Sequence, residues 1–322
     1  AKTRAYYVLR HLARSHDVTL ASFVRPEDTA QAIDHLRSLC TALHTVPMVR
    51  SGLLNLRATI KATASGMPLI IVRDEITAMH DLLRQLMDQG RFDVIHADQT
   101  SMAQYALYGR RMAPMDRRPR LVFDVHNALH RVYMQMAVDE SNPLRRALYR
   151  REARALERYE RGLWSQFDAA VFVSDRDRAA MGAPAQDRPG LATIPICAAP
   201  GDKRLVVPNE HPRTVLHLGT MFWPPNVQGM LWFAREVWPI VARQEPEARL
   251  VIIGRRPPAE VEALAGDPRI EVTGYVEDPT PYLEDTAAFL VPLHAGAGMR
   301  VKIMDAWSWG VPVVTTTLGA EG

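Results

Sequence analysis

Residues 293–322 read LHAGAGMRVKIMDAWSWGVPVVTTTLGAEG, and this stretch decides the fold. After an apolar segment, alanine and glycine alternate over 295–298, and a helical pattern begins near Met299. Glycine lets a ligand approach the backbone closely, and the free amides and dipole at a helix start favour an anion. Arg300 and Lys302 add two cations in the first turn. The stretch therefore predicts a strand–loop–helix unit that binds phosphate.

Strand and helix patterns alternate along the rest of the chain. Strands that are apolar throughout belong to parallel sheets covered on both faces. Two such blocks predict two doubly wound, Rossmann-like α/β domains that face each other across a cleft. The stretch 197–211 mixes Pro, Gly and charge, so we expect domains over 1–200 and 201–322. Thr29–Leu43 reads as one of the intervening helices. The predicted strands are Val18–Val24, Phe92–His96, Leu121–Val125, Ala169–Val173, Leu191–Ile196, Thr214–Leu218, Arg249–Ile253, Ile270–Thr273, Ala287–Pro292 and Val311–Thr316.

The composition is that of an ordinary globular protein. With 47% hydrophobic and 23% charged residues, it excludes a disordered or fibrous chain. A chain of 322 residues buries a large core without disulfides or a structural metal. Cys40 and Cys197 lie far apart and outside any zinc-binding spacing, which favours a reducing compartment. No apolar run is long enough to cross a bilayer, so we expect a cytoplasmic protein.

Several motifs, in order along the chain, resemble those of group 1 (family 4) retaining glycosyltransferases, which have the GT-B fold. GAGMRVKIMDAWSWGVPVVTTTLGAEG at 296–322 resembles their nucleotide-sugar signature: a Gly-rich loop, a Lys, an acid followed by Ala, G-x-PVV and a terminal G-x-EG. Further similar segments are LHLGTMFWPPNVQGMLWF at 216–233, VIIGRRP at 251–257, VTGYVED at 272–278, DVIHADQTSMAQYAL at 93–107, FDVHNALHRVY at 123–133 and VFVSDRDRAAM at 171–181.

The resemblance implies sugar transfer from a nucleoside-diphosphate sugar to an acceptor hydroxyl, with retention of anomeric configuration. The implied acceptor is a glycan or a lipid-linked molecule, and neither a cofactor nor a metal is implied. By matching positions, Arg300 and Lys302 would hold the diphosphate, Asp305 would contact the ribose, and His126 would lie near the reacting sugar. His126, Arg300 and Lys302 are thus the expected catalytic residues. The other expected donor-binding residues are Gly219, Thr220, Tyr275, Val276, Gly298 and Met299.

Two departures from the family pattern leave alternatives open. Ala297 stands where many relatives carry a Glu, and Asp305 is one methylene shorter than the usual Glu. A GT-B sugar-nucleotide epimerase or hydrolase would share the donor site, and a catalytically inactive member would bind the nucleotide sugar without turnover. The resemblance also implies that the first domain lacks its opening strand and the second its C-terminal part. We therefore expect this chain to be weakly active or inactive.

Two other patterns resemble metal motifs. Ser174–Asp177 contains a DxD, but a Ser followed three residues later by an acid also has the spacing of a helix capping box. His126 and His130 are four residues apart, but the Glu of an HExxH motif is missing. We therefore predict a cap at the first pattern and no metal site at either.

An amphipathic pattern lies within residues 35–73, which contain no acid. Over 48–63 it fits a helix that lies on an anionic membrane at its inner face, and the alternative is a helix packed on its own domain. Basic residues over 145–161 are interrupted by Glu, which predicts a salt-bridged helix, so we expect no nucleic-acid partner. The apolar positions of the first pattern are Val49, Leu53, Leu56 and Ile60, and its basic positions are Arg50, Arg57 and Lys61.

Overall fold

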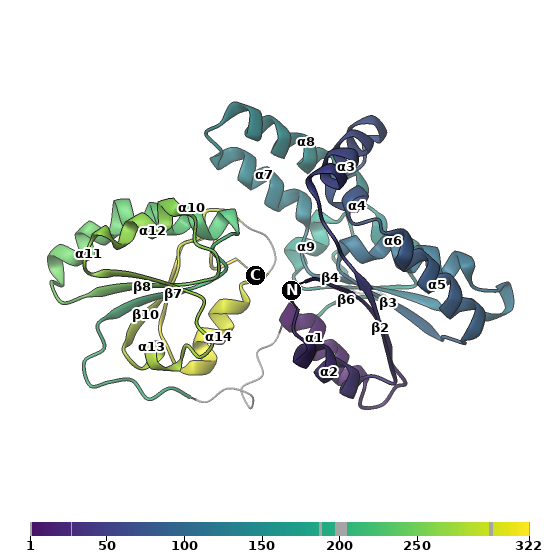
Figure 1. Cartoon of the computed structure of the whole chain (residues 1–322), viewed down its shortest axis with the longest axis horizontal. Coiled ribbons are helices and arrows are strands. Elements are labelled where there is room, and N and C mark those ends of the chain that lie inside the picture. The colour runs from purple at the N-terminus through teal and green to yellow at the C-terminus, as the bar shows by residue number, and fades with distance from the viewer. Residues whose placement is uncertain (1, 27, 187–188, 197–204, 296–298, 322) are drawn as a thin grey trace. The chain divides into compact units, whose positions relative to one another are not determined.

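The computed structural model describes residues 2–26, 28–186, 189–196, 205–295 and 299–321, and the chain divides into two compact units (Figure 1). The first unit comprises Ala1–His130 and Arg151–Pro195, and the second comprises Arg131–Arg150 and Ile196–Gly322. Each unit is built on parallel β-sheet. Every helix of the described residues is too short or too polar to cross a lipid bilayer.

The first unit contains a two-stranded and a four-stranded parallel sheet. The larger sheet has the order β3-β4-β5-β6, and its apolar strands place Leu121, Phe123 and Phe172 in one buried core cluster. The strands are β1 (Thr19–Val24), β2 (Ala42–Pro47), β3 (Val94–Asp98), β4 (Arg120–Val125), β5 (Ala169–Phe172) and β6 (Leu191–Thr193).

The helix predicted over Thr29–Leu43 is wrong at its C-terminal end. Helix α2 (Ala30–Leu39) stops at Cys40, whose backbone is extended. The following segment pairs in register with β1 as β2, and Val46 is buried in a separate small core cluster. Pairing with β1 and burial of Val46 therefore outweigh the helical pattern that the sequence continues beyond Leu39.

The helices of the first unit cover its sheets, and two of them continue into the second unit. These two are α7 (Leu129–Asp139) and α8 (Pro143–Glu160). The others are α1 (Lys2–Leu12), α3 (Gly52–Ser65), α4 (Leu69–Arg73), α5 (Thr77–Gln89), α6 (Thr100–Met112) and α9 (Asp175–Ala180), with the short 3-10 helices η1 (Met115–Arg117) and η2 (Leu163–Gln166).

The second unit contains a five-stranded parallel sheet with the order β11-β10-β7-β8-β9. Alternate residues of its strands enter two core clusters, as Leu250 and Val251 illustrate, so both faces are apolar. The strand order reverses between β7 and β10, and ligands of doubly wound sheets bind outside the carboxyl ends at such a point. The strands are β7 (Thr214–Leu218), β8 (Arg249–Ile253), β9 (Ile270–Gly274), β10 (Thr286–Val291) and β11 (Val313–Thr315).

Helical segments cover both faces of this second sheet (Figure 1). One face bears α10 (Pro224–Trp232), the π-helical segment η4 (Phe233–Val237), α11 (Trp238–Gln244), α12 (Ala259–Glu262) and the 3-10 helix η5 (Ala263–Gly266). The other bears α13 (Thr280–Glu284) and α14 (Val301–Trp309).

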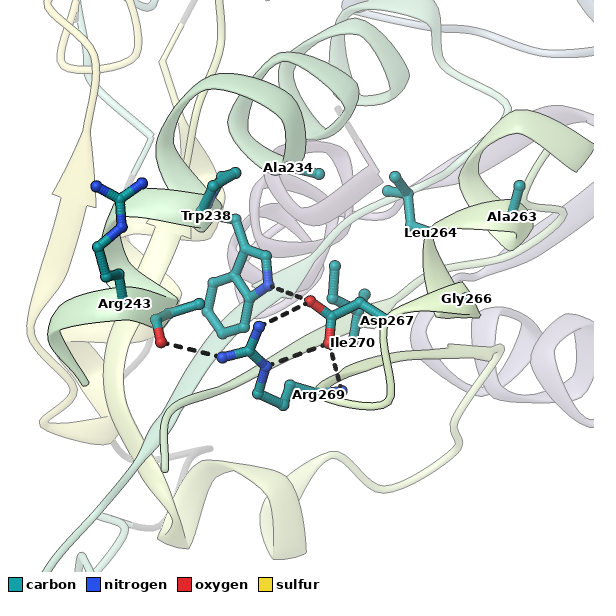
Figure 2. A pocket seen from close by; sticks show the side chains of 11 residues that line it. Ala234, Trp238, Arg243, Ala263, Leu264, Gly266, Asp267, Arg269 and Ile270 are labelled. Carbon is teal, nitrogen blue, oxygen red and sulfur yellow. Dashed lines mark hydrogen bonds and ion pairs between the residues drawn. The ribbon is translucent and has the colours of Figure 1, made fainter. Parts of the chain in front are cut away.

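A surface pocket of about 480 Å³ lies between α11, η5 and β9 (Figure 2). In it, Trp238 Nε1 donates to Asp267 Oδ2 over 3.4 Å, and the Asp267 carboxylate also pairs with Arg269 at 3.1 Å. These contacts tie α11 to the start of β9. None of the predicted donor-binding residues lines this pocket.

The Ser174–Asp177 segment is a helix cap, as predicted. Ser174 Oγ accepts a hydrogen bond from the Asp177 backbone N–H over 3.1 Å, and the Ser174 hydroxyl donates to Asp177 Oδ2 over 2.5 Å. The buried Asp177 carboxylate also accepts the backbone N–H of Ala128 over 2.9 Å. Asp177 therefore stabilises the start of α9 and the loop after β4, and its carboxylate is occupied by hydrogen bonds.

Replacing Asp177 with Ala removes the acceptor of the Ser174 hydroxyl and leaves the buried Ala128 N–H without its acceptor. We expect Asp177→Ala to lower the free energy of unfolding by about 2 kcal/mol or more, measured by urea denaturation. Asp175→Ala is the matched control, because Asp175 is exposed and accepts a solvent-exposed hydrogen bond from the Thr193 hydroxyl; its effect should be about 1 kcal/mol or less. Equal effects of the two substitutions would contradict the role of Asp177 in holding Ser174 and the loop after β4.

Candidate functional site

The carboxyl ends of β7 and β10 bring two distant segments of the second unit together. Gly219 follows β7, and the chain that follows β10 leads to α14. The strand ends are crowded: a Cβ on Gly254, after β8, would lie 1.9 Å from the carbonyl oxygen of Gly219. Only glycine fits at position 254, so the backbones of the β7 and β8 ends can approach closely.

Lys302, Gly219 and Thr220, three of the predicted donor-binding residues, meet at this edge. Lys302 Nζ donates to Asn226 Oδ1 over 3.1 Å, and Asn226 Nδ2 donates to the carbonyl oxygen of Thr220 over 2.9 Å. A Cβ on Gly219 would lie 2.7 Å from Lys302 Nζ, so only glycine at position 219 leaves room for the ammonium. Asn226, buried near the start of α10, is a site residue that the sequence analysis did not identify.

The Lys302 ammonium lies in an environment that disfavours its charge. Burial and, second, the neighbouring Arg300 charge lower its pKa to about 7. Within the described residues, no carboxylate forms an ion pair with Lys302. A divalent anion at this point would supply the missing counter-charge, so the geometry suits a phosphate or diphosphate.

The other predicted residues of the loop and of α14 are close to Lys302 in the sequence, but each of them contacts a different part of the protein. Arg300 Nη2 donates to the carbonyl oxygen of Leu318 over 3.3 Å. Met299 Sδ accepts the backbone N–H of Ile196 over 3.0 Å. Asp305 lies three residues after Lys302 in α14, on the same side of the helix. Gly298, also predicted, lies outside the described residues.

Tyr275 and Val276, the residues predicted to flank the base, follow the end of β9. The Tyr275 ring is 59% exposed, and the guanidinium of Arg255 lies 4.0 Å above its centroid, a cation–π contact. Val276 packs against the core. Among the described residues, Tyr275 contacts Arg255, which the sequence did not single out, and Val276 contacts the core, so neither is joined to Lys302 by a hydrogen bond or a ring contact.

His126, the site residue predicted in the first unit, is buried at the carboxyl end of β4. Its Nε2 lies 2.8 Å from Oδ1 of Asp98, at the end of the adjacent β3, and 3.7 Å from Oδ2 of Asp124. Burial alone would lower the pKa of His126, but hydrogen bonding and charge from Asp124 and Asp98 outweigh it, so the pKa is raised. His126 is therefore set up to carry a proton and to donate hydrogen bonds.

Asp98, Asp124 and His126 each place one ligand atom within 4.8 Å of the others, which is the spacing of a metal site. Asp124 is already paired, however: Arg4 Nε of α1 lies 2.8 Å from its Oδ1 and 3.0 Å from its Oδ2. Burial would raise the pKa of Asp124, but His126 and Arg4 lower it below its usual value. A guanidinium on the carboxylate and a protonated histidine fit a hydrogen-bond network better than they fit a cation.

Two buried carboxylates hold the chain that follows His126. Besides Asp177, Glu160 of α8 accepts the backbone N–H groups of Leu129 and His130, each over 3.0 Å. His130 Nδ1 lies 2.7 Å from Glu160 Oε2, so the His130 side chain is bound to Glu160 and not to His126.

The backbone next to Asp98 is strained. Gln99, which follows Asp98, has a φ of +78°, a conformation of the kind that clusters at functional sites.

Two protein families match this chain, one over each of the two parts that hold the candidate residues. The family described as "Glycosyl transferase 4-like domain" matches residues 1–197, and the family described as "Glycosyl transferases group 1" matches residues 212–322. An "Uncharacterized 44.6 kDa protein in cps region" of Klebsiella pneumoniae is 23% identical over 319 residues, which cover 95% of this chain and 76% of that protein.

Solved structures share the fold at low sequence identity. HepE of Anabaena, in complex with UDP and glucose, is 12% identical, with a TM-score of 0.62 over 98% of this chain and 77% of that one. Sucrose-phosphate synthase from Thermosynechococcus elongatus is also 12% identical, with a TM-score of 0.61 over 97% of this chain and 75% of that one. These likenesses confirm the predicted GT-B fold class. The chain is a transferase that belongs to the group 1 glycosyltransferases, with a glycosyltransferase 4-like N-terminal domain.

Proposed function

We propose that this chain transfers a sugar from a nucleoside-diphosphate sugar to an acceptor hydroxyl, with retention of anomeric configuration. The observation that carries the proposal is the Lys302 ammonium at the carboxyl edge of the second sheet, held by Asn226 beside Gly219 and without a carboxylate partner among the described residues. Solved relatives bound to UDP or to UDP-glucose support a nucleotide-sugar donor. The acceptor class is a glycan or a lipid-linked molecule.

Transfer requires the nucleoside diphosphate to leave as an anion while the sugar acquires positive charge. Lys302 and Arg300 would stabilise the charge that develops on the leaving diphosphate, and fixed cations are effective because they need no reorganisation. Lys302 has no carboxylate partner among the described residues, so its charge is available for the diphosphate. The reaction in this form requires no metal and no cofactor.

The family resemblance implies retention, and the raised pKa of His126 supports a role for this residue other than that of a base. Its raised pKa favours the protonated ring, which donates hydrogen bonds and accepts no proton. His126 would therefore orient a sugar hydroxyl, and an oxygen of the leaving diphosphate would take the proton of the acceptor on the same face of the sugar. In the donor site, Asp305 would contact the ribose, and the exposed Tyr275 would lie beside the base.

We expect Lys302→Ala to lower donor turnover by about 100-fold or more, because a preorganised charge on the leaving group is lost. The measurement is release of nucleoside diphosphate across a panel of nucleotide sugars, with and without acceptors and with EDTA. Arg243→Ala removes an exposed cation of the same unit and should leave turnover unchanged.

Wild-type turnover in Lys302→Ala would contradict the assignment of Lys302. Donor consumption without an acceptor would favour an epimerase or hydrolase, and binding without turnover an inactive member. Loss of transfer in EDTA would contradict the metal-independent mechanism. An inverted anomeric product would contradict retention.

We further propose that α3 contacts an anionic membrane at its inner face. The side of α3 that faces its own domain bears small residues, since Ala58 and Ala62 are buried. The apolar stripe of α3 instead points to solvent, with exposed fractions of 61% at Leu53, 57% at Leu56 and 62% at Ile60. Val49, which the sequence pattern placed in the same helix, is 68% exposed but precedes α3, because the helix begins at Gly52 after the Ser51 cap. An exposed apolar stripe on an anchored helix marks an interaction surface.

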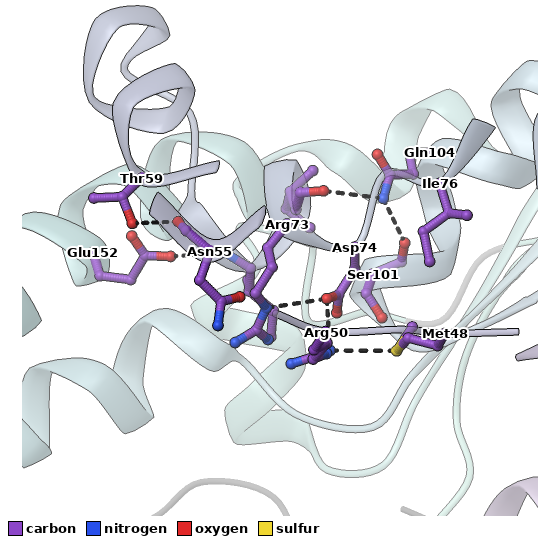
Figure 3. A network of polar contacts seen from close by, with 12 residues as sticks. Met48, Arg50, Asn55, Thr59, Arg73, Asp74, Ile76, Ser101, Gln104 and Glu152 are labelled. Atoms are coloured by element: carbon purple, nitrogen blue, oxygen red, sulfur yellow. Dashed lines mark hydrogen bonds and ion pairs between the residues drawn. The ribbon is translucent and has the colours of Figure 1, made fainter. Parts of the chain in front are cut away.

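Polar contacts anchor α3 and α4 so that the stripe stays exposed (Figure 3). Arg50 lies 2.8 Å from Asp74, and the buried Glu152 accepts the backbone N–H of Ile70 over 3.3 Å. Lys61 pairs with Glu75 at 2.6 Å, which leaves Arg57 as the exposed cation of the helix without a carboxylate partner among the described residues. This surface would bind lipid mainly through apolar contact, with anionic lipid adding to it.

The wild-type protein should therefore sediment with anionic liposomes at low salt. We expect the triple variant Leu53→Gln/Leu56→Gln/Ile60→Gln to lose at least about tenfold in the bound fraction at limiting lipid, because buried apolar area drives the association. Ile240→Gln/Val314→Gln, which changes exposed apolar residues of the second unit, is the matched control. Absence of sedimentation by the wild type, or equal binding of all three proteins, would contradict the proposal.

A further inference from the structure

His217 is a fully buried histidine in the middle of the apolar strand β7. Its Nδ1 lies 2.9 Å from the carbonyl oxygen of Leu290 on the neighbouring β10. A carbonyl oxygen only accepts hydrogen bonds, so Nδ1 carries the proton. Burial and, second, the charge of Lys302 lower the pKa of His217 well below its usual value, so the ring stays neutral. Its Nε2 therefore presents a lone pair.

This lone pair and the Lys302 ammonium face the same small space. A Cβ on Gly219 would lie 2.8 Å from His217 Nε2 and 2.7 Å from Lys302 Nζ. No described residue donates a hydrogen bond to the buried Nε2 atom. A buried polar atom without a partner is destabilising, and a small movement of the flexible Lys302 side chain would bring an N–H donor to this one.

Two N–H donors lie beside Nε2, the Lys302 ammonium and the Asn226 amide nitrogen. The Asn226 amide already donates to the Thr220 carbonyl oxygen, so the ammonium is the donor with N–H groups to spare. The phosphate oxygens of a nucleotide carry no proton at neutral pH, so they cannot donate to Nε2. The Lys302 ammonium has three N–H donors, of which Asn226 Oδ1 accepts one. Imidazole nitrogen and amide oxygen are both neutral acceptors, and they orient an ammonium without cancelling its charge. A carboxylate in either place would neutralise the charge that the diphosphate needs.

We propose that His217 is a positioning residue for the donor site: its Nε2 accepts a hydrogen bond from the charged Lys302. Together with Asn226, it would direct the remaining N–H of Lys302 and its positive charge at the diphosphate. The role of His217 in catalysis rests on the function proposed above, but its contact with Lys302 does not. This role was not among those that the family resemblance implies.

Two substitutions separate the two ring nitrogens. The amide of Asn reaches only as far as Nδ1, so His217→Asn keeps a donor for the Leu290 carbonyl and removes the Nε2 acceptor. The longer amide of Gln reaches the Nε2 position, so His217→Gln keeps an acceptor for Lys302 and removes the donor to Leu290. If Nε2 positions Lys302, Gln restores function and Asn does not. If His217 only links β7 to β10, the order is reversed.

The first measurement uses the protein without any nucleotide. The chain has only four lysines, Lys2, Lys61, Lys203 and Lys302, so ¹³Cε-lysine NMR gives few signals, and Lys302→Arg assigns the relevant one. We expect Lys302 in His217→Asn to titrate at lower pH than in the wild type, because the lost acceptor favoured the charged form. His217→Gln should titrate close to the wild type. Equal titration in all three proteins, or the reverse order, would overturn the proposal.

The second measurement is UDP affinity by calorimetry, with thermal unfolding to confirm that each variant is folded. We expect His217→Asn to bind UDP at least about tenfold more weakly than the wild type and His217→Gln to recover most of the loss. Wild-type affinity in a folded His217→Asn would overturn the positioning role. If the wild-type protein fails to bind any nucleotide while the lysine titrations differ as expected, the proposed function fails and the His217–Lys302 contact stands.

Discussion

An ammonium group that lacks a counter-charge is the constraint on which the donor site depends. Lys302 is brought to the carboxyl edge of the second sheet by the strand order, in which β7 and β10 are neighbours although they lie about 70 residues apart. Its described hydrogen-bond partner, Asn226, is neutral. The free energy spent on burying this charge is recovered when an anion binds, so the site is selective for groups with concentrated negative charge.

The buried charged groups of the first unit, by contrast, have partners of opposite charge or backbone N–H groups close by. Asp124 is paired with Arg4, and His126 lies against Asp98. Glu160 and Asp177 are satisfied by backbone N–H groups of the loop after His126. These paired charges hold the chain after β4 in place, and the carboxylates beside the imidazole raise the pKa of His126, whereas the second unit has a cation without a counter-charge among the described residues.

The sequence predicted the structure best where a residue pattern is compatible with only one type of secondary structure. β7 and β8 were predicted to the residue, because a parallel strand buried on both faces is a continuous apolar run. β2 was missed because its polar residues follow a helix without a break and only pairing with β1 reveals it. Asn226 and His217 were missed for a related reason: each acts through a contact with a residue more than 70 positions away. For His217 a signal existed, namely a single histidine inside an otherwise apolar strand.

Lys302 should meet the diphosphate as a cation, although burial lowers its pKa to about 7 in the free protein. The most direct measurement is the number of protons taken up when UDP binds at pH 8, from calorimetry in buffers of different ionisation enthalpy. With a pKa of about 7 in the free protein, Lys302 is mostly deprotonated at that pH, and an adjacent diphosphate raises the pKa again. Uptake of close to one proton by the wild type, and of none by Lys302→Arg, is the expected result. Tight binding of UDP without proton uptake by the wild type would contradict it.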